Sequence, residues 1–264
     1  MDMPRNAFKR ALAAGEKQIG LFLGLGNATI AELIAGTGFD WVLVDGEHGP
    51  NDLRTIIAQL QALAAYPVSP VVRTLDHDAA RIKQLLDAGA QTLMVPMVES
   101  ADQARALVRA MRYPPHGMRG VGTAMARAAR WNGVGSYFEH ADAEQCLVVQ
   151  IESRAALEGL EGILQVDGVD AVFVGPSDLA ASLGHLGKPG HPEVRAAVAR
   201  AIEQIAAAGK AAGVFSADPA VAAGYLDLGA RFLLVGVDAL LLRNAAVDLA
   251  ARFKEGAAGS GASY

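Results

Sequence analysis

The chain has 264 residues, which exceeds the usual size of one domain but matches the roughly 250 residues that close a single α/β barrel. Its residues are 52% hydrophobic and only 6% aromatic, so we expect a large core of aliphatic and small side chains, and a disordered or fibrous protein is excluded. The formal net charge of −5 does not provide the basic surface that nucleic acids or anionic membranes bind, so we expect neither as a partner.

The single cysteine, Cys146, excludes an intrachain disulfide and a cysteine-based zinc site. Because Cys146 opens an apolar run, we expect it to be buried. The first residues lack the apolar segment of a secretory signal, and no uninterrupted run of about 18 apolar residues follows. We therefore expect a cytoplasmic protein.

Short aliphatic runs alternate with helical patterns along the chain, which predicts βα units and a parallel sheet. Eight such strands close most economically into a barrel, so the predicted fold class is α/β, a (β/α)8 TIM barrel, in one domain over residues 1–255. Residues 256–264 are rich in Gly, Ala and Ser, and we expect a disordered tail there. The expected strands span residues 19–23, 41–45, 70–74, 92–96, 147–151, 171–174, 212–215 and 232–235.

Apolar residues at helical spacing between the strands predict helices that cover the sheet. One helix is expected to follow a capping Asn51, another to end at Gly89, and a third to begin with a capping box of Ser100 and Gln103.

Two segments do not fit the simple βα pattern. Residues 113–140 are irregular, contain three arginines and are long for a barrel connection, so we expect a functional or interfacial role. Residues 237–253 read VDALLLRNAAVDLAARF, and their apolar residues cover more than one helical face. We expect this C-terminal helix to pack on a neighbouring subunit of a homo-oligomer.

Polar residues stand where the expected strands end, and in a barrel these ends meet at one mouth. Glu152 and Asp178 follow successive strands, and two hard oxygen ligands suit magnesium or manganese. Pro176 at a helix start leaves the backbone N–H groups of Ser177 and Asp178 free to bind a substrate carboxylate. The alternative is that Asp178 only caps its helix and Glu152 is a surface acid.

Two further mouth residues have both a catalytic and a structural interpretation. His48 stands three residues after Asp45, close enough for the carboxylate to orient the imidazole and raise its basicity, although a loop histidine can simply be solvated. Arg73 ends an apolar strand, where it could stabilise oxyanion charge. Alternatively, Arg73 pairs with Glu47 or Asp87.

Several common catalytic motifs are missing from the sequence. It has no GxxxxGK[ST] loop, no HExxH and no GxGxxG after a strand. No lysine stands at the C-terminal end of an expected strand, which disfavours an aldolase that works through a Schiff base.

Six motifs in order, from about residue 20 to residue 253, resemble those of the metal-dependent pyruvate aldolases of the 4-hydroxy-2-oxoheptanedioate aldolase family. The resemblance implies a class II aldolase that cleaves or forms a bond between pyruvate and an aldehyde with Mg²⁺, Mn²⁺ or Co²⁺. It also implies a cytoplasmic hexamer that acts in aromatic catabolism. The motifs are FDWVLVDGEHGPND, PVVR, LLDAGAQTLMVPMVES, YPPHGMRGVG, VVQIE and FVGPSDL.

The resemblance also implies roles for individual residues. Glu152 and Asp178 match the metal ligands, and Arg73 matches the arginine that stabilises the pyruvate enolate. Asp45 and His48 match the dyad that handles the aldol proton.

Other matched positions contact the substrates in the resembled family. Gln150 matches an amide near the keto acid, and Asp87 matches an acidic residue contributed near a subunit boundary. Phe22, Ser177 and Phe215 stand where the family commonly has Trp, Ala and a smaller aliphatic residue, on the wall that faces the aldehyde. We expect the two phenylalanines to set aldehyde choice without affecting the pyruvate step.

Succinic semialdehyde is the expected aldehyde, and 4-hydroxy-2-oxoheptanedioate is the expected aldol. One alternative is a 2-keto-3-deoxy sugar acid aldolase with a hydroxyaldehyde acceptor. A second is a magnesium-dependent acyl-CoA lyase, whose CoA would need the arginines of residues 113–140. A third is a non-enzymatic binding or scaffold subunit, which the presence of both Glu152 and Asp178 disfavours.

Overall fold

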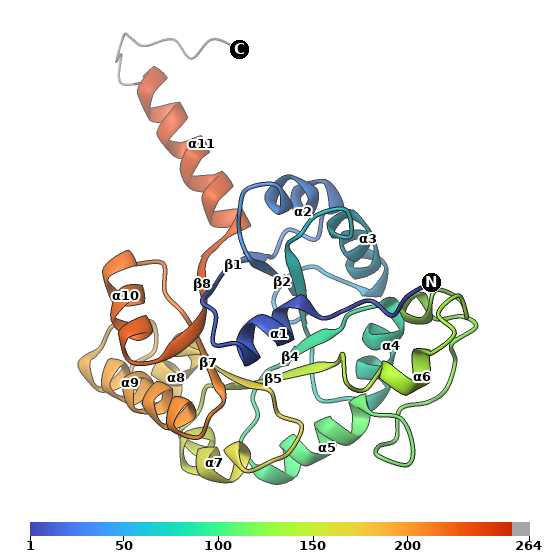
Figure 1. The fold of residues 1–264 in the computed structure, drawn as a ribbon. Helices are drawn as coiled ribbons and strands as arrows, with labels where there is room; N and C mark the ends of the chain where they lie inside the picture. The colour runs from blue at the N-terminus through green and yellow to red at the C-terminus, as the bar shows by residue number, and fades with distance from the viewer. Residues whose placement is uncertain (255–264) are drawn as a thin grey trace.

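The computed structural model describes residues 1–254 and forms a closed barrel of parallel strands surrounded by helices (Figure 1). Neighbouring strands pair in sequence order, and β1 pairs with β8 to close the barrel. Each strand lies within two residues of its expected position, so the predicted (β/α)8 fold is confirmed. The expected tail, residues 256–264, lies outside the described residues. The strands are β1 (Gln18–Leu23), β2 (Trp41–Asp45), β3 (Ser69–Arg73), β4 (Thr92–Val95), β5 (Cys146–Ile151), β6 (Ala171–Val174), β7 (Ala211–Phe215) and β8 (Ala230–Val237).

Most of the helices pack around the barrel and bury an apolar face against its outer surface (Figure 1). The helices are α1 (Ala7–Ala13), α2 (Ala28–Ala35), α3 (Leu53–Leu63), α4 (Ala79–Ala88), α5 (Ala101–Met111), α6 (Tyr137–His140), α7 (Arg154–Leu164), α8 (Pro176–Ser182), α9 (Pro192–Ala207), α10 (Pro219–Asp227) and α11 (Asp238–Lys254), with a short 3-10 turn, η1 (Arg127–Ala129), before α6.

The start of α3 differs from the expected one. Its N-cap is Asp52, whose side chain accepts a hydrogen bond from the Thr55 N–H at 2.8 Å, while the Thr55 hydroxyl accepts one from the Asp52 N–H. Asn51 instead donates its amide to the backbone oxygen of Asp45 at 2.8 Å. The reciprocal Asp52–Thr55 bonds satisfy two N–H groups at the helix start, so the prediction of Asn51 as the cap was wrong.

Two other helix ends were predicted more closely. α4 ends at Gly89, whose φ of 103° lies in the left-handed region. α5 begins after Ser100, whose hydroxyl accepts from the Gln103 N–H at 3.3 Å. The Gln103 side chain, however, accepts from the Glu99 N–H at 2.7 Å, so the capping box is only half formed.

Aromatic side chains fill the barrel interior toward its N-terminal end, where α1 lies across the opening (Figure 1). The Phe8 ring of α1 lies 5.2 Å from Trp41 and 5.6 Å from Phe232, centroid to centroid. A Cβ at Gly20 would lie 2.4 Å from Trp41, and one at Gly213 would lie 2.3 Å from Phe232. The two glycines therefore make room for the two large rings. Cys146 is buried in the same cluster, as expected.

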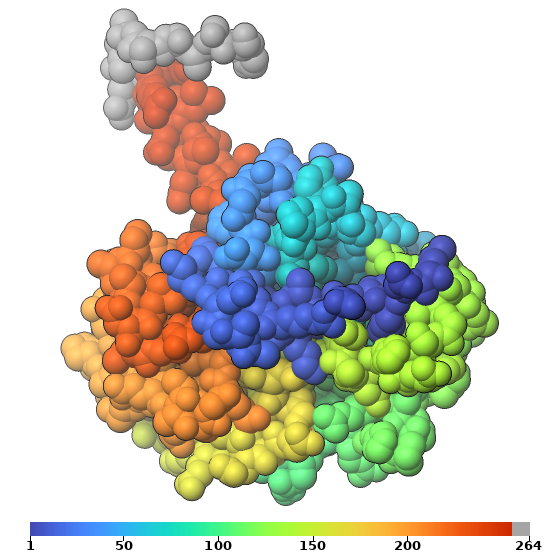
Figure 2. All heavy atoms as spheres, in the orientation of Figure 1, coloured from blue at the N-terminus to red at the C-terminus, as the bar shows by residue number. Residues whose placement is uncertain are grey.

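The C-terminal helix α11 projects away from the barrel (Figures 1 and 2). Its first residue, Asp238, is buried and accepts hydrogen bonds from the N–H groups of Gly24 and Leu25 at 3.0 and 3.1 Å, which anchors the helix to the end of β1. Beyond this anchor the leucines of α11 are exposed, including Leu242 and Leu249. Within residues 1–254, no helix is both long enough and apolar enough to span a membrane.

We expect α11 to dock on a neighbouring subunit, because an isolated projecting helix with exposed leucines leaves a large apolar surface in water. The double change Leu242→Asp and Leu249→Asp should convert the oligomer, which we expect to be a hexamer, into smaller species at micromolar concentration. Size-exclusion chromatography with light scattering measures this. Leu186→Asp, at an exposed leucine between α8 and α9, is the matched control and should leave the oligomer intact. A monomeric parent protein would contradict the prediction.

Candidate active site

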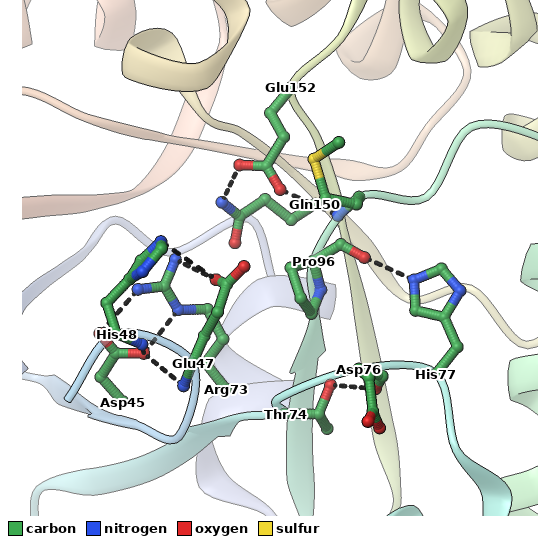
Figure 3. Close-up of polar contacts among 11 residues, drawn as sticks. Asp45, Glu47, His48, Arg73, Thr74, Asp76, His77, Pro96, Gln150 and Glu152 are labelled. Carbon is green, nitrogen blue, oxygen red and sulfur yellow. Dashed lines mark hydrogen bonds and ion pairs between the residues drawn. The ribbon is translucent and has the colours of Figure 1, made fainter. Parts of the chain in front are cut away.

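The parallel register of β2 and β3 places Asp45 directly beside Arg73 at the mouth of the barrel. Arg73 donates Nε–H to Asp45 Oδ1 at 2.8 Å and Nη2–H to Oδ2 at 2.7 Å, and both residues are buried (Figure 3). Burial raises the pKa of Asp45, but the hydrogen bonds and charge of Arg73 outweigh it, so the pKa lies below its usual value. The carboxylate thus stays charged and fixes the guanidinium in one orientation.

Glu47 also contacts Arg73, with Oε2 at 2.9 Å from Nη1. Burial raises the pKa of Glu47, and the charges of Arg73 and His48 oppose that rise. The loop can take this path because residue 46 is a glycine. A Cβ at this position would lie only 2.5 Å from the backbone oxygen of Arg73. Sequence reasoning considered Glu47 only as an alternative partner for Arg73, although its position two residues after Asp45 in the same loop was a usable signal.

His48 lies at the rim of the mouth, with its side chain 69% exposed. Its Nε2 is 3.9 Å from Glu47 Oε2, and its contact with Asp45 is through its backbone N–H, which donates to Oδ1 at 3.4 Å. The Asp45 carboxylate therefore does not orient the imidazole, contrary to expectation, because Arg73 occupies both of its oxygens. The role of His48 in proton transfer stays a prediction.

Glu152 follows β5 and is only 3% exposed, so it is not the surface acid of the alternative interpretation. Its Oε1 accepts the Met97 N–H at 2.8 Å, and its Oε2 accepts the side-chain amide of Gln150 (Figure 3). The other amide atom, Gln150 Oε1, is buried without a hydrogen-bond partner among residues 1–254. A Cβ at Gly175 would lie 2.5 Å from Glu152 Oε2, so this space beside the carboxylate requires glycine.

The pKa of Glu152 is raised to about 7, mainly by burial and also by the negative charges of Asp178 and Glu47, while the hydrogen bonds from Met97 and Gln150 oppose the rise. Each of these two acids is thus close enough to act on Glu152. Carboxylate oxygens with surplus negative charge are the donor set that Mg²⁺, Mn²⁺ and Co²⁺ accept, so the residues present fit a divalent cation.

Ser177 and Asp178 lie in the first turn of α8, which begins at Pro176 as expected. Both side chains are exposed. The residue before the helix is Gly175, and no side chain of the described residues caps α8. The first N–H groups of the helix therefore have no side-chain acceptor among the described residues, and the carboxylate site expected there stays a prediction.

Phe22 and Phe215 form one wall of the mouth, with ring centroids 6.0 Å apart. The guanidinium carbon of Arg73 lies 5.1 Å from the Phe22 centroid. A cation over an aromatic ring is attracted to it, so Phe22 helps to hold Arg73. The expectation that neither phenylalanine affects the pyruvate step therefore fits Phe215 better than Phe22.

Asp87 is not brought to the mouth of its own barrel. It lies in the last turn of α4, at the opposite end, where its Oδ1 is 2.7 Å from Arg119 Nη2. The proposed role of Asp87 near a substrate thus requires a neighbouring subunit.

A second group of potential metal ligands, His185, His191 and Glu193, lies at the start of α9 with ligand atoms within 4.8 Å of one another. His185 Nε2 forms a hydrogen bond of 2.7 Å with the Glu193 carboxylate, and His191 Nδ1 accepts the Glu193 N–H at 3.3 Å. Since Nδ1 is the acceptor, a neutral His191 carries its proton on Nε2 and has no free lone pair for a metal. A hydrogen-bonded helix cap accounts for this group.

Comparison with known proteins adds four similarities to this geometry. Residues 18–245 match the model of the HpcH/HpaI aldolase/citrate lyase family. The chain is 59% identical over 263 residues to a hydroxypyruvate/pyruvate aldolase of Pseudomonas aeruginosa, covering 100% of this chain and 98% of the relative. It is 58% identical over 249 residues to a 4-hydroxy-2-oxo-heptane-1,7-dioate aldolase of Salmonella dublin, covering 94% and 95%. A solved HpcH/HpaI aldolase/citrate lyase family protein from Burkholderia cenocepacia J2315 superposes with a TM-score of 0.91 at 41% identity, covering 94% of this chain and 99% of that one.

The raised pKa of Glu152 predicts how the stability of the metal-free protein depends on pH. Between the unfolded value of 4.5 and the folded value of about 7, the folded state holds a proton that the unfolded chain has released. The free energy of unfolding should therefore fall as pH rises through this range, by up to roughly 3 kcal/mol. Urea denaturation in the presence of a chelator measures it, and Glu152→Gln should remove this part of the slope. Equal slopes for the two proteins would contradict the assigned pKa.

Proposed function

Because the chain belongs to the HpcH/HpaI aldolase/citrate lyase family and is an aldolase, a carbon–carbon lyase, we propose that it reversibly joins pyruvate to an aldehyde with the help of a divalent metal. The observation that carries the proposal is the arrangement at the mouth. A buried, fixed guanidinium, Arg73, shares the mouth with a mutually repelling set of carboxylates, Glu152, Asp178 and Glu47.

A divalent cation held by Glu152 and Asp178 would supply polarisation of the 2-keto group of pyruvate, which acidifies the methyl protons. Arg73 keeps N–H groups on both terminal nitrogens after its contacts with Asp45 and Glu47, and these are available to an oxygen that gains negative charge. Asp45 acts through Arg73, because its carboxylate determines where those N–H groups point.

The other mouth residues bind and orient the keto acid. The free N–H groups at the start of α8, including those of Ser177 and Asp178, favour the pyruvate carboxylate. Gln150 holds the Glu152 carboxylate in place through its amide. His48, exposed at the rim, is placed to exchange a proton between the aldol hydroxyl and water.

The aldehyde proposed is succinic semialdehyde, which makes 4-hydroxy-2-oxoheptanedioate the aldol. Similarity to the Salmonella dublin enzyme supports this choice. The 59% identity to a hydroxypyruvate/pyruvate aldolase favours a second candidate, in which hydroxypyruvate replaces pyruvate as the keto acid. Residues 113–140 do not favour the acyl-CoA lyase alternative, because Arg119 and Arg127 of this segment line a cavity with residues that precede β3, β4 and β5, at the end of the barrel opposite the mouth.

The direct test combines metal binding with a substrate panel. Asp178→Asn should weaken Mn²⁺ binding, measured by electron paramagnetic resonance of free Mn²⁺, by more than about tenfold. Asp102→Asn, at an exposed acid of α5, is the control and should bind Mn²⁺ normally.

The parent enzyme should form product from pyruvate or hydroxypyruvate with succinic semialdehyde or glyceraldehyde, and a chelator should stop product formation. Full activity in chelator would sink the proposal.

The two mouth phenylalanines should separate aldehyde choice from the pyruvate step. Phe215→Leu should redistribute catalytic efficiency among aldehydes by roughly 10- to 200-fold while leaving exchange of pyruvate methyl protons nearly unchanged. Phe22→Leu should slow that exchange as well, because its ring contacts Arg73. Proton exchange is followed by NMR in deuterated water, with Phe39→Leu, which packs against the outer core, as control. Unchanged exchange in Phe22→Leu would show that its contact with Arg73 has no catalytic effect.

A further inference from the structure

A cavity of about 250 Å³ lies at the end of the barrel opposite the mouth, beside the starts of β3, β4 and β5. Its walls come from α3, α4, the first residues of the chain and the 113–140 segment. Figure 2 shows the N-terminal residues, in dark blue, lying along this face against the yellow-green residues of that segment. Among the described residues that line the cavity there are four arginines, Arg5, Arg119, Arg127 and Arg130, and no carboxylate.

Arg119 is 2% exposed and provides a buried donor without an acceptor. Its Nη2 pairs with Asp87 at 2.7 Å and with the Tyr137 hydroxyl at 3.2 Å. Its Nε is buried without a hydrogen-bond partner among residues 1–254. Unsatisfied buried N–H groups are rare because they cost free energy, so Arg119 lines the cavity as a cation whose donors the described residues do not fully satisfy.

Arg127 and Arg130 provide positive charge that no carboxylate lining the cavity neutralises. Arg127 donates to the backbone oxygens of Ala88 and Leu60 at 3.1 and 3.2 Å, and Arg130 donates to the Arg127 oxygen at 3.2 Å. Burial, together with the neighbouring charge of Arg130, lowers the pKa of Arg127. An anion in the cavity would relieve this repulsion.

The backbone that carries Arg130 is strained. Arg130, Trp131 and Asn132 have φ angles of 49°, 52° and 65°, so three consecutive residues other than glycine adopt the left-handed region. Such strain persists only where surrounding structure holds it, and it concentrates at ligand sites. The strained turn presents Arg130 to the cavity.

Much of the rest of the lining is apolar, including Leu60, Leu63, Val68 and Leu86, and the amides of Gln91 and Gln145 are its polar part. An apolar cavity of about 150 Å³ accommodates a benzene molecule. The cavity here has room for such a ring and a carboxylate, whereas an inorganic oxyanion would leave the apolar walls without contacts. We propose that the cavity binds a small organic acid with one carboxylate on an apolar, ring-sized body, at a site separate from the barrel mouth.

Benzoate is the probe for this site, titrated by calorimetry into the full chain loaded with Mn²⁺ and saturated with pyruvate so that the mouth is occupied. Benzoate should bind, whereas neutral benzamide should not. Arg130→Gln should weaken binding by about tenfold or more, as expected for loss of a charge-assisted contact. Ala128→Phe, which fills the cavity from a half-buried position, should abolish binding.

Arg105→Gln is the matched control, because it removes one arginine from the exposed surface of α5, and it should bind benzoate as the parent does. Thermal melting establishes that each variant is folded. The proposal is overturned if benzoate fails to bind at millimolar concentration, or if both cavity variants bind it with parental affinity. It is also overturned if phosphate displaces benzoate at equal concentration, since the site would then recognise negative charge alone.

Discussion

The ion pair between Arg73 and Asp45 determines how the rest of the mouth is arranged. Both residues are buried at the end of a water-excluding core, where an unpaired charge would cost several kcal/mol. The register of β2 and β3 brings them side by side, so the pair is a property of the barrel and not of a flexible loop. Glu47 and Phe22 then take positions defined by the fixed guanidinium, one at its edge and one beneath its face.

The site forms the uppermost layer of the packed barrel interior. Side chains alternate along each strand between the interior and the surrounding helices, and Trp41, Leu43 and Asp45 form one such inward row. The large rings of Trp41 and Phe232 fill the lower layers above α1, where the small residues opposite them leave space. This filled floor keeps the layer above it fixed and dry, which strengthens every charge interaction there. The inward residues of this layer lie at the last or next-to-last position of their strands and include Phe22, Asp45, Arg73, Gln150 and Phe215.

The two ends of the barrel carry opposite charge imbalances. At the mouth, the acids Asp45, Glu47, Glu152 and Asp178 outnumber the single buried guanidinium, and the negative charges of Glu47 and Asp178 act on the buried Glu152. At the opposite end, arginines line a cavity that has no lining carboxylate. Buried charges are stable when they are paired, so the first imbalance favours a cation and the second an anion. The two imbalances therefore support the two sites that we propose, one for each sign, in a protein with a net charge of −5.

The sequence predicts the barrel and several mouth residues, because a polar side chain at the end of an aliphatic run, such as Arg73 or Glu152, interrupts an otherwise uniform pattern. It does not reveal which residues of a strand face inward, since parallel strands covered by helices are apolar on both faces. No spacing or pattern in the sequence indicates that Asp45 contacts Arg73. The contact joins residues 28 positions apart and depends on strand register, which sequence periodicity does not contain. The arginine-lined cavity is still less accessible, because it requires the left-handed turn at Arg130 and the packing of the N-terminal residues against it. Chemistry carried by strand ends is therefore visible in a single sequence, whereas chemistry assembled from irregular segments becomes visible only when their backbone conformations are known.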